Sequence, residues 1–201
     1  TGGFSFTGTQ PLTDAAALSR LPPETKGRNV RVVDLKAAGF DDFTPQAAYG
    51  YRPIKPCYTV TDLYRDGKPL EVAVAPNPDV RLEDFYRIGA VLDPKHDVFK
   101  ADFPMMDKWA EEKDVMAQGW WTFLWASTTI PVEKIDPVAK TVTVARVPNV
   151  FHYPATSNKV FTLENGLPAL DRENEWVFDR SAGKAYVLEP AAAKGATYTI
   201  T

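Results

Sequence analysis

The residues with the clearest chemical potential in this sequence are aromatic and gather in two short runs. Three of the five tryptophans lie in Trp120–Ala126, and a second aromatic run, Phe151–Tyr153, contains one of the two histidines. Aromatic rings can stack on a sugar, because the C–H groups of the sugar meet the π-surface while its hydroxyls stay in water. The candidate carbohydrate contacts are therefore Trp120, Trp121, Trp125, His152 and Tyr153.

The run Trp120–Ala126 is rich in aromatic side chains, which favours a β-strand. Side chains alternate along a strand, so Trp121, Phe123 and Trp125 would share one face and the intervening residues the other. One of these rows is expected to form the core of a sheet. The aromatic residues of the other row would then be exposed to solvent on the opposite face of the strand.

Acidic residues are numerous, but their spacing does not identify a catalytic pair. A glycosidase needs two carboxyl groups roughly 5 to 9.5 Å apart, with one of them in an apolar setting. The flanks of the acidic residues are mostly polar, which is typical of solvated loops, and no catalytic residue is assigned. The carboxylates considered are Asp41, Asp42, Glu83, Asp84, Glu111, Glu112, Asp171, Glu173 and Glu175.

Metal, thiol and phosphate chemistry have little support in the residue types. Cys57 is the single cysteine, which excludes an intrachain disulfide and a zinc cluster of cysteine ligands. With only His96 and His152, a histidine-rich metal site is also excluded. Cys57 could act as a nucleophile with a histidine base, but a lone thiol among aromatic residues and prolines is more often core. A Gly-rich phosphate loop and a Gly-x-Ser-x-Gly motif are both missing, so neither metal nor cofactor is expected.

The composition describes an ordinary globular chain. Its 201 residues are 44% hydrophobic and 24% charged, with a formal net charge of -3, which argues against wholesale disorder. The balance of 23 Lys and Arg against 26 Asp and Glu argues against a nucleic-acid partner. No run approaches the roughly 18–20 apolar residues of a membrane span, so no membrane partner is expected either.

Short β-branched and aromatic runs flank turn signals along the whole chain. Asp66-Gly67 between two apolar runs predicts a hairpin, and further hairpins are expected at 130–147 and 175–188. A short helix is expected over 14–20, where Asp14 can cap its start and two prolines follow it. Together these patterns predict a mainly β fold, a β-sandwich or open barrel built from hairpins with a few short helices, forming a single domain over 1–201.

Four segments of the chain resemble parts of one known kind of domain. The most specific pattern is Glu-Trp-x-x-Asp-Arg-x-x-Gly-x-x-Tyr, which spans Glu175–Tyr186. In these segments the chain resembles the accessory β-domain that interrupts large right-handed parallel β-helix proteins related to glycoside hydrolases, which polysaccharide-degrading bacteria secrete. The four segments are Leu21–Leu35, Leu63–Asn77, Gly119–Asp136 and Leu163–Pro190.

The resemblance implies a non-catalytic accessory domain that shapes or covers the polysaccharide site of a periplasmic, secreted or cell-surface parent. The implied partners are a polysaccharide or oligosaccharide and the β-helix portion of the parent chain. The catalytic acids of the parent, a glycoside hydrolase or polysaccharide lyase, would lie on that β-helix. This chain lacks the stacked repeats of roughly 20 to 30 residues that a solenoid needs. It also departs from the family pattern at Leu124 and Ser127, where acidic residues are common.

Two further functions stay open at this point. An independent carbohydrate-binding module would expose several of its aromatic residues in a line or groove. A small glycosidase or lyase would need two facing carboxylates, or a basic residue beside a cleft. The accessory-domain hypothesis makes a different prediction, that the two ends of the chain lie close together, as an insertion requires.

Overall fold

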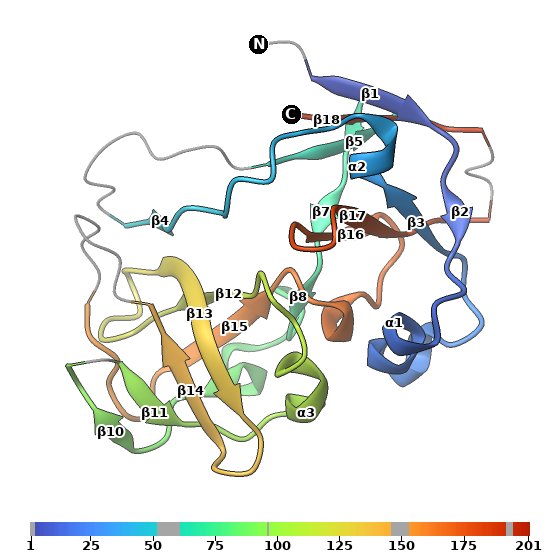
Figure 1. Cartoon of the computed structure of the whole chain (residues 1–201). Helices are drawn as coiled ribbons and strands as arrows, with labels where there is room; N and C mark the ends of the chain where they lie inside the picture. The colour runs from blue at the N-terminus through green and yellow to red at the C-terminus, as the bar shows by residue number, and fades with distance from the viewer. Residues whose placement is uncertain (1–2, 52–60, 96, 146–152, 192–194) are drawn as a thin grey trace. The chain divides into compact units, whose positions relative to one another are not determined.

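The computed structural model describes residues 3–51, 61–95, 97–145, 153–191 and 195–201 (Figure 1). The described residues are mainly β, with 37% in strands and 13% in helices, and none of their sheets closes into a barrel. The predicted fold class is confirmed, and the arrangement of several sheets is consistent with a β-sandwich.

The chain divides into two compact units. Unit 1 consists of Thr1–Pro45, Val60–Ala73 and Asn165–Thr201, and unit 2 consists of Gln46–Thr59 and Val74–Glu164. Every sheet lies wholly inside one unit. That the whole chain acts as one accessory domain stays a prediction.

Unit 1 contains two sheets. The first has the strand order β1-β18-β5-β6 and the second has the order β2-β3-β17-β16-β7, in which only the pair β16–β7 is parallel. The strands of the first sheet are β1 (Phe4–Thr7), β18 (Thr197–Ile200), β5 (Leu63–Arg65) and β6 (Lys68–Pro69). The strands of the second are β2 (Gln10–Pro11), β3 (Val30–Asp34), β17 (Lys184–Leu188), β16 (Glu175–Asp179) and β7 (Glu71–Val72).

One apolar core joins the two sheets of unit 1. The first sheet contributes Phe6 and Tyr198, whose rings stack with centroids 5.4 Å apart, and the second contributes Trp176 and Phe178. These four side chains are buried, and burying aromatic surface of this size is a dominant stabilising contribution in a unit this small. Two sheets that enclose a shared core are the arrangement of a β-sandwich, one of the two folds that the sequence predicted.

The two ends of the described chain lie side by side in unit 1. β1 pairs with β18 in antiparallel register, so Phe4 lies opposite Ile200 and Thr7 opposite Thr197 (Figure 1). A Cβ on Gly3 would lie 2.6 Å from the Thr199 methyl group, which shows how closely the two strands approach. The prediction that the chain ends are close together is confirmed.

The Glu175–Tyr186 motif builds the hairpin of β16 and β17. Asp179 Oδ1 accepts a hydrogen bond from the Ala182 amide at 2.8 Å, and Gly183 takes the left-handed conformation (φ 68°) that the turn requires. The guanidinium of Arg180 lies 4.5 Å from the Phe178 ring centroid and donates to the Thr44 carbonyl at 3.0 Å. The motif is therefore explained by packing and turn geometry within unit 1.

Helices are short in the described residues. α1 begins as predicted, because the Asp14 carboxylate accepts from the Ala17 amide at 2.7 Å. No helix in the described residues is both long and apolar enough to cross a membrane. The helices are α1 (Ala15–Arg20), η1 (Pro23–Thr25), α2 (Leu35–Ala38) and η3 (Leu167–Ala169) in unit 1, with η2 (Leu82–Asp84) and α3 (Met106–Trp109) in unit 2.

Unit 2 contains one sheet of nine strands. Its main path is β10-β11-β14-β13-β12-β15-β8, with β4 paired to β13 and β9 paired to β15. Phe99, Ile130, Phe161 and Leu163 are fully buried along it. The strands are β4 (Tyr49–Gly50), β8 (Val74–Ala75), β9 (Tyr86–Arg87), β10 (Val91–Asp93), β11 (Val98–Lys100), β12 (Met116–Gly119), β13 (Thr128–Asp136), β14 (Thr141–Val144) and β15 (Val160–Glu164).

Candidate functional site

The tryptophan-rich segment is a loop of unit 2, and the strand predicted over Trp120–Ala126 is wrong. β12 ends at Gly119, and the hairpin partner β13 begins at Thr128. The ladder continues only as far as the Trp120 amide, which donates to the Val160 carbonyl at 3.0 Å. The alternation expected for residues 120–126 therefore does not apply.

The indole ring of Trp121 is the physical reason for the bend. It folds back over Gly119, where an added Cβ would lie 2.2 Å from the ring. The ring is 1% exposed, its Nε1 donates to the Thr128 carbonyl at 3.0 Å, and it packs on Phe99 with centroids 6.2 Å apart. Burying this large side chain and satisfying its N–H outweighs the strand preference of the local sequence.

Neighbouring segments hold the base of the loop on both sides. The Thr122 hydroxyl donates to the Pro154 carbonyl at 2.9 Å, and the Tyr51 amide donates to the Ser127 carbonyl at 2.8 Å. Gly50 has a φ of 123° and lies so close to Ser127 that an added Cβ would be 2.6 Å from its carbonyl oxygen. This close approach brings Tyr51 beside the loop. The hydrogen bond from Thr122 to Pro154 likewise brings Tyr153, the residue before Pro154, beside the loop.

Four aromatic side chains meet at the tip of this loop, and we call Tyr51, Phe123, Trp125 and Tyr153 the aromatic cluster. The rings of Phe123 and Trp125 lie nearly parallel, with centroids 5.3 Å apart, and those of Tyr51 and Tyr153 are also nearly parallel at 6.3 Å. The two pairs meet edge to face, at 5.1 Å between Tyr51 and Trp125 and 4.9 Å between Phe123 and Tyr153. Each such pair is worth about 0.5–1.5 kcal/mol beyond burial, so the cluster is held in place before any ligand arrives.

The aromatic cluster is open to solvent. Trp125 is 64% exposed, Phe123 40% and the adjacent Leu124 55%, whereas Tyr51 and Tyr153 are half-buried. These exposed apolar side chains make the loop tip a candidate interaction surface. The two tyrosines add phenol hydroxyls, which can donate and accept hydrogen bonds at the edge of this surface.

The structure places the candidate residues from the sequence in different environments. Trp125 and Tyr153 lie in the aromatic cluster, Trp121 is core, and Trp120 is half-buried against Phe85 at 5.5 Å between centroids. His152, Cys57 and His96 lie outside the described residues. Sequence reasoning did not select Phe123 or Tyr51 as contacts. Phe123 stood in the expected row with Trp125, whereas nothing in the spacing pointed to Tyr51.

Among the carboxylates considered, Glu175 has a perturbed pKa for a structural reason. Burial raises its pKa to about 7, although its Oε2 accepts from the Arg172 and Asp171 amides at 3.0 and 3.1 Å. The residue is 3% exposed and closes the turn that precedes β16. A carboxyl group enclosed in this way does not reach a polymer.

A second buried carboxyl group lies in unit 2. Burial raises the pKa of Glu164, and the Tyr49 hydroxyl donates to its Oε2 at 2.9 Å. In the described part of the chain, no group of three His, Cys, Asp or Glu side chains is arranged to hold a metal ion. Glu164 thus supplies a local hydrogen bond within unit 2.

Comparison with known proteins adds one likeness of fold. No protein-family model matches the chain, and no curated protein matches it. A solved structure titled "Glycoside hydrolase" superposes with a TM-score of 0.58 at 17% sequence identity, covering 100% of this chain and 31% of that one. This likeness is one of fold. The chain spans about a third of the length of that protein.

Substituting Gly119 with alanine tests the bend at Trp121. We expect the variant to lower the free energy of unfolding by about 1–3 kcal/mol, because the new Cβ overlaps the indole ring. Urea denaturation of the variant measures this loss. In a Trp121→Ala background the same change has room and should cost less, and equal costs in both backgrounds would contradict the steric explanation.

Proposed function

We propose that this chain is a non-catalytic accessory domain of a carbohydrate-active protein, and that its aromatic cluster contacts the polysaccharide. The exposed side of Trp125, braced by three further rings, is the observation that carries the proposal. A sugar ring that lies on this surface would bury C–H groups against the indole. Its hydroxyls would stay in water or meet the phenol groups of Tyr51 and Tyr153.

Two further observations support an accessory role. The chain shares its fold with about a third of a structure titled "Glycoside hydrolase", so a domain of this kind occurs within a longer chain of that name. The pairing of β1 with β18 brings the chain ends together, as insertion into another domain requires. In this proposal the parent is a parallel β-helix protein of a polysaccharide-degrading bacterium, and it acts in the periplasm or outside the cell.

Replacing Trp125 with alanine tests the proposed contact. Affinity gel electrophoresis first identifies the polysaccharide that retards the chain most strongly. For this polysaccharide we expect roughly a tenfold or greater loss of affinity, because an exposed tryptophan is a typical binding hot spot. Trp125→Phe should retain part of the affinity, since a smaller aromatic surface remains. Trp125→Ala should also lower the free energy of unfolding by about 1–3 kcal/mol, because it removes the ring contacts with Tyr51, Phe123 and Tyr153, and Trp125→Phe should lower it less.

Leu92→Ala is the matched control, because Leu92 is an exposed apolar residue of unit 2 that lies in β10 and outside the aromatic cluster. It should bind as the unmodified chain does. Equal affinity of the Trp125→Ala variant and the unmodified chain would contradict the proposed contact.

An independent carbohydrate-binding module is the second candidate, and the same exposed cluster favours it. The two candidates differ in where the affinity resides. A module binds polysaccharide as strongly alone as when attached to a catalytic partner. An accessory domain that shapes a site should bind weakly alone, and its Trp125→Ala change should lower the kcat/KM of the parent on polymer more than on a short oligosaccharide.

A further inference from the structure

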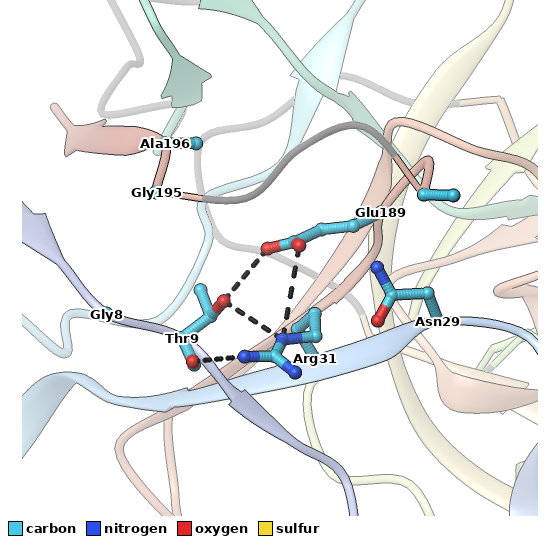
Figure 2. A pocket seen from close by; sticks show the side chains of 8 residues that line it. Gly8, Thr9, Asn29, Arg31, Glu189, Gly195 and Ala196 are labelled. Atoms are coloured by element: carbon cyan, nitrogen blue, oxygen red, sulfur yellow. Dashed lines mark hydrogen bonds and ion pairs between the residues drawn. The ribbon is translucent and has the colours of Figure 1, made fainter.

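Unit 1 contains a cavity of about 350 Å³ that the proposed function does not use. It is lined by Thr9, Arg31, Asn29 and Glu189, together with Gly8, Ala191, Gly195 and Ala196 (Figure 2). Its volume lies at the lower end of the range for small-molecule pockets.

Three neighbouring strands position the polar and charged side chains of this cavity. Thr9 precedes β2, Arg31 lies in β3 and Glu189 follows β17, and these strands are adjacent in the second sheet of unit 1. The Asn29 carbonyl accepts from the Glu189 amide at 3.0 Å, which continues the pairing of β3 with β17 beyond its last ladder residue. The backbone of Arg31 and Glu189 is therefore held by strand pairing.

Arg31 and Glu189 face each other across the Thr9 hydroxyl, as Figure 2 shows. Arg31 Nε donates to Thr9 Oγ1 at 3.2 Å and lies 4.0 Å from Glu189 Oε2, while Thr9 Oγ1 donates to Glu189 Oε1 at 2.9 Å. The buried Tyr198 hydroxyl also donates to Glu189 Oε1. Glu189 is 5% exposed and the Arg31 side chain 22%, so both charges are held largely out of water beside the cavity.

We propose that this cavity binds one neutral, hydroxyl-rich sugar residue. The opposite charges of Arg31 and Glu189 offset each other, so an anion would meet the carboxylate and a cation the guanidinium. A sugar hydroxyl both donates and accepts, which matches donors on Arg31 and Asn29 and acceptors on Glu189 and Asn29. Hydrogen bonds to ionised groups are about twice as strong as neutral ones, and the partners are already positioned.

The choice of a sugar over other neutral polar ligands rests on the proposed function, whereas the neutral polar character follows from the cavity itself. The cavity would then be a sugar subsite in unit 1, made of different residues from the aromatic cluster of unit 2. One assay can follow both sites, because their backbone amides are distinct.

The test uses the ¹⁵N-labelled chain titrated with methyl glycosides of glucose, galactose, mannose and xylose. We expect at least one of them to shift the amide signals of Gly8, Thr9, Asn29 and Gly195 in a saturable way. Asn29→Ala should weaken this binding about fivefold, the loss expected for one hydrogen bond, and leave the fold intact because the Asn29 backbone carbonyl remains. Arg31→Lys should weaken it further, and Gln10→Ala, an exposed change in β2 outside the cavity, should leave it unchanged.

The outcomes separate the two proposals. Shifts at the cavity that persist in the Trp125→Ala variant support the subsite whether or not the aromatic cluster binds polymer. No saturable shift at the cavity amides with any of the four glycosides would overturn the subsite, even if the aromatic cluster binds polysaccharide. Tighter binding of glucuronate, inorganic sulfate or choline at these amides would overturn it too, because the cavity would then select a charge.

Discussion

Replacing Trp121 with alanine is expected to lower the free energy of unfolding by about 3–5 kcal/mol and to abolish binding at the aromatic cluster. The buried indole contacts Phe99, covers Gly119 and donates to the Thr128 carbonyl at 3.0 Å. Its removal leaves a cavity in the core of unit 2 and releases the loop that presents Phe123 and Trp125. Urea denaturation gives the stability change, and affinity electrophoresis on polysaccharide gives the binding change.

Trp121→Phe keeps the prediction testable if the alanine variant does not fold. It retains an aromatic ring in the core but removes the Nε1 donor, so the loss of stability should be smaller. Binding should fall in both variants although neither removes a ring of the aromatic cluster. Unchanged stability of Trp121→Ala would contradict the anchoring role of the indole, and unchanged binding would show that the tip holds its shape without it.

The second large effect is a pH dependence that arises from Glu175. Burial raises the pKa of this carboxyl group to about 7, from 4.5 when unperturbed. The folded state therefore favours the protonated form, and its stability falls as the pH rises from about 4.5 to about 7, after which this contribution is constant. The shift corresponds to about 3 kcal/mol of unfolding free energy.

Glu175→Gln should remove this dependence. Its amide oxygen can still accept from the Asp171 and Arg172 amides, but it cannot ionise. We expect the variant to be about 2–3 kcal/mol more stable than the unmodified chain at pH 8 and equally stable at pH 4. Urea denaturation across this range measures both limits.

Glu71→Gln is the control for this comparison, because Glu71 is exposed on the parallel neighbour strand directly opposite Glu175. It removes the same formal charge without removing a buried carboxyl group. The burial explanation fails if Glu71→Gln reproduces the effect, or if the Glu175→Gln variant gains no stability at pH 8.

The sequence predicted the hairpin turns correctly because their signals are local. The second arm expected after Asp66-Gly67, over residues 70–75, was wrong, because β7 pairs with β16 and β8 pairs with β15. Asp66 and Gly67 both take positive φ angles in the turn between β5 and β6, as the Asp-Gly pair indicated. Asp136 Oδ1 accepts from the Ala139 amide at 2.8 Å in the β13–β14 turn, where a hairpin was expected. In each case a few neighbouring residues set the turn, so no distant contact was needed to infer it.

The division into two units was not apparent from the sequence. Unit 1 is assembled from three stretches of chain and unit 2 from two. β16 pairs with β7 and β17 pairs with β3 across more than a hundred residues of sequence. Pairings of this range depend on burial in the final core, and no local pattern encodes them.

The sequence by itself determined the mainly β class, the hairpin turns and the presence of a dense aromatic segment over 120–126. Only the tertiary structure decided which of those rings is core and which is exposed. Trp121 is buried because Gly119, Phe99 and the Thr128 carbonyl surround one pocket for its indole, and they come from three strands. Trp125 is exposed because that burial bends the chain outward, and Tyr51 joins it only because β4 pairs with β13.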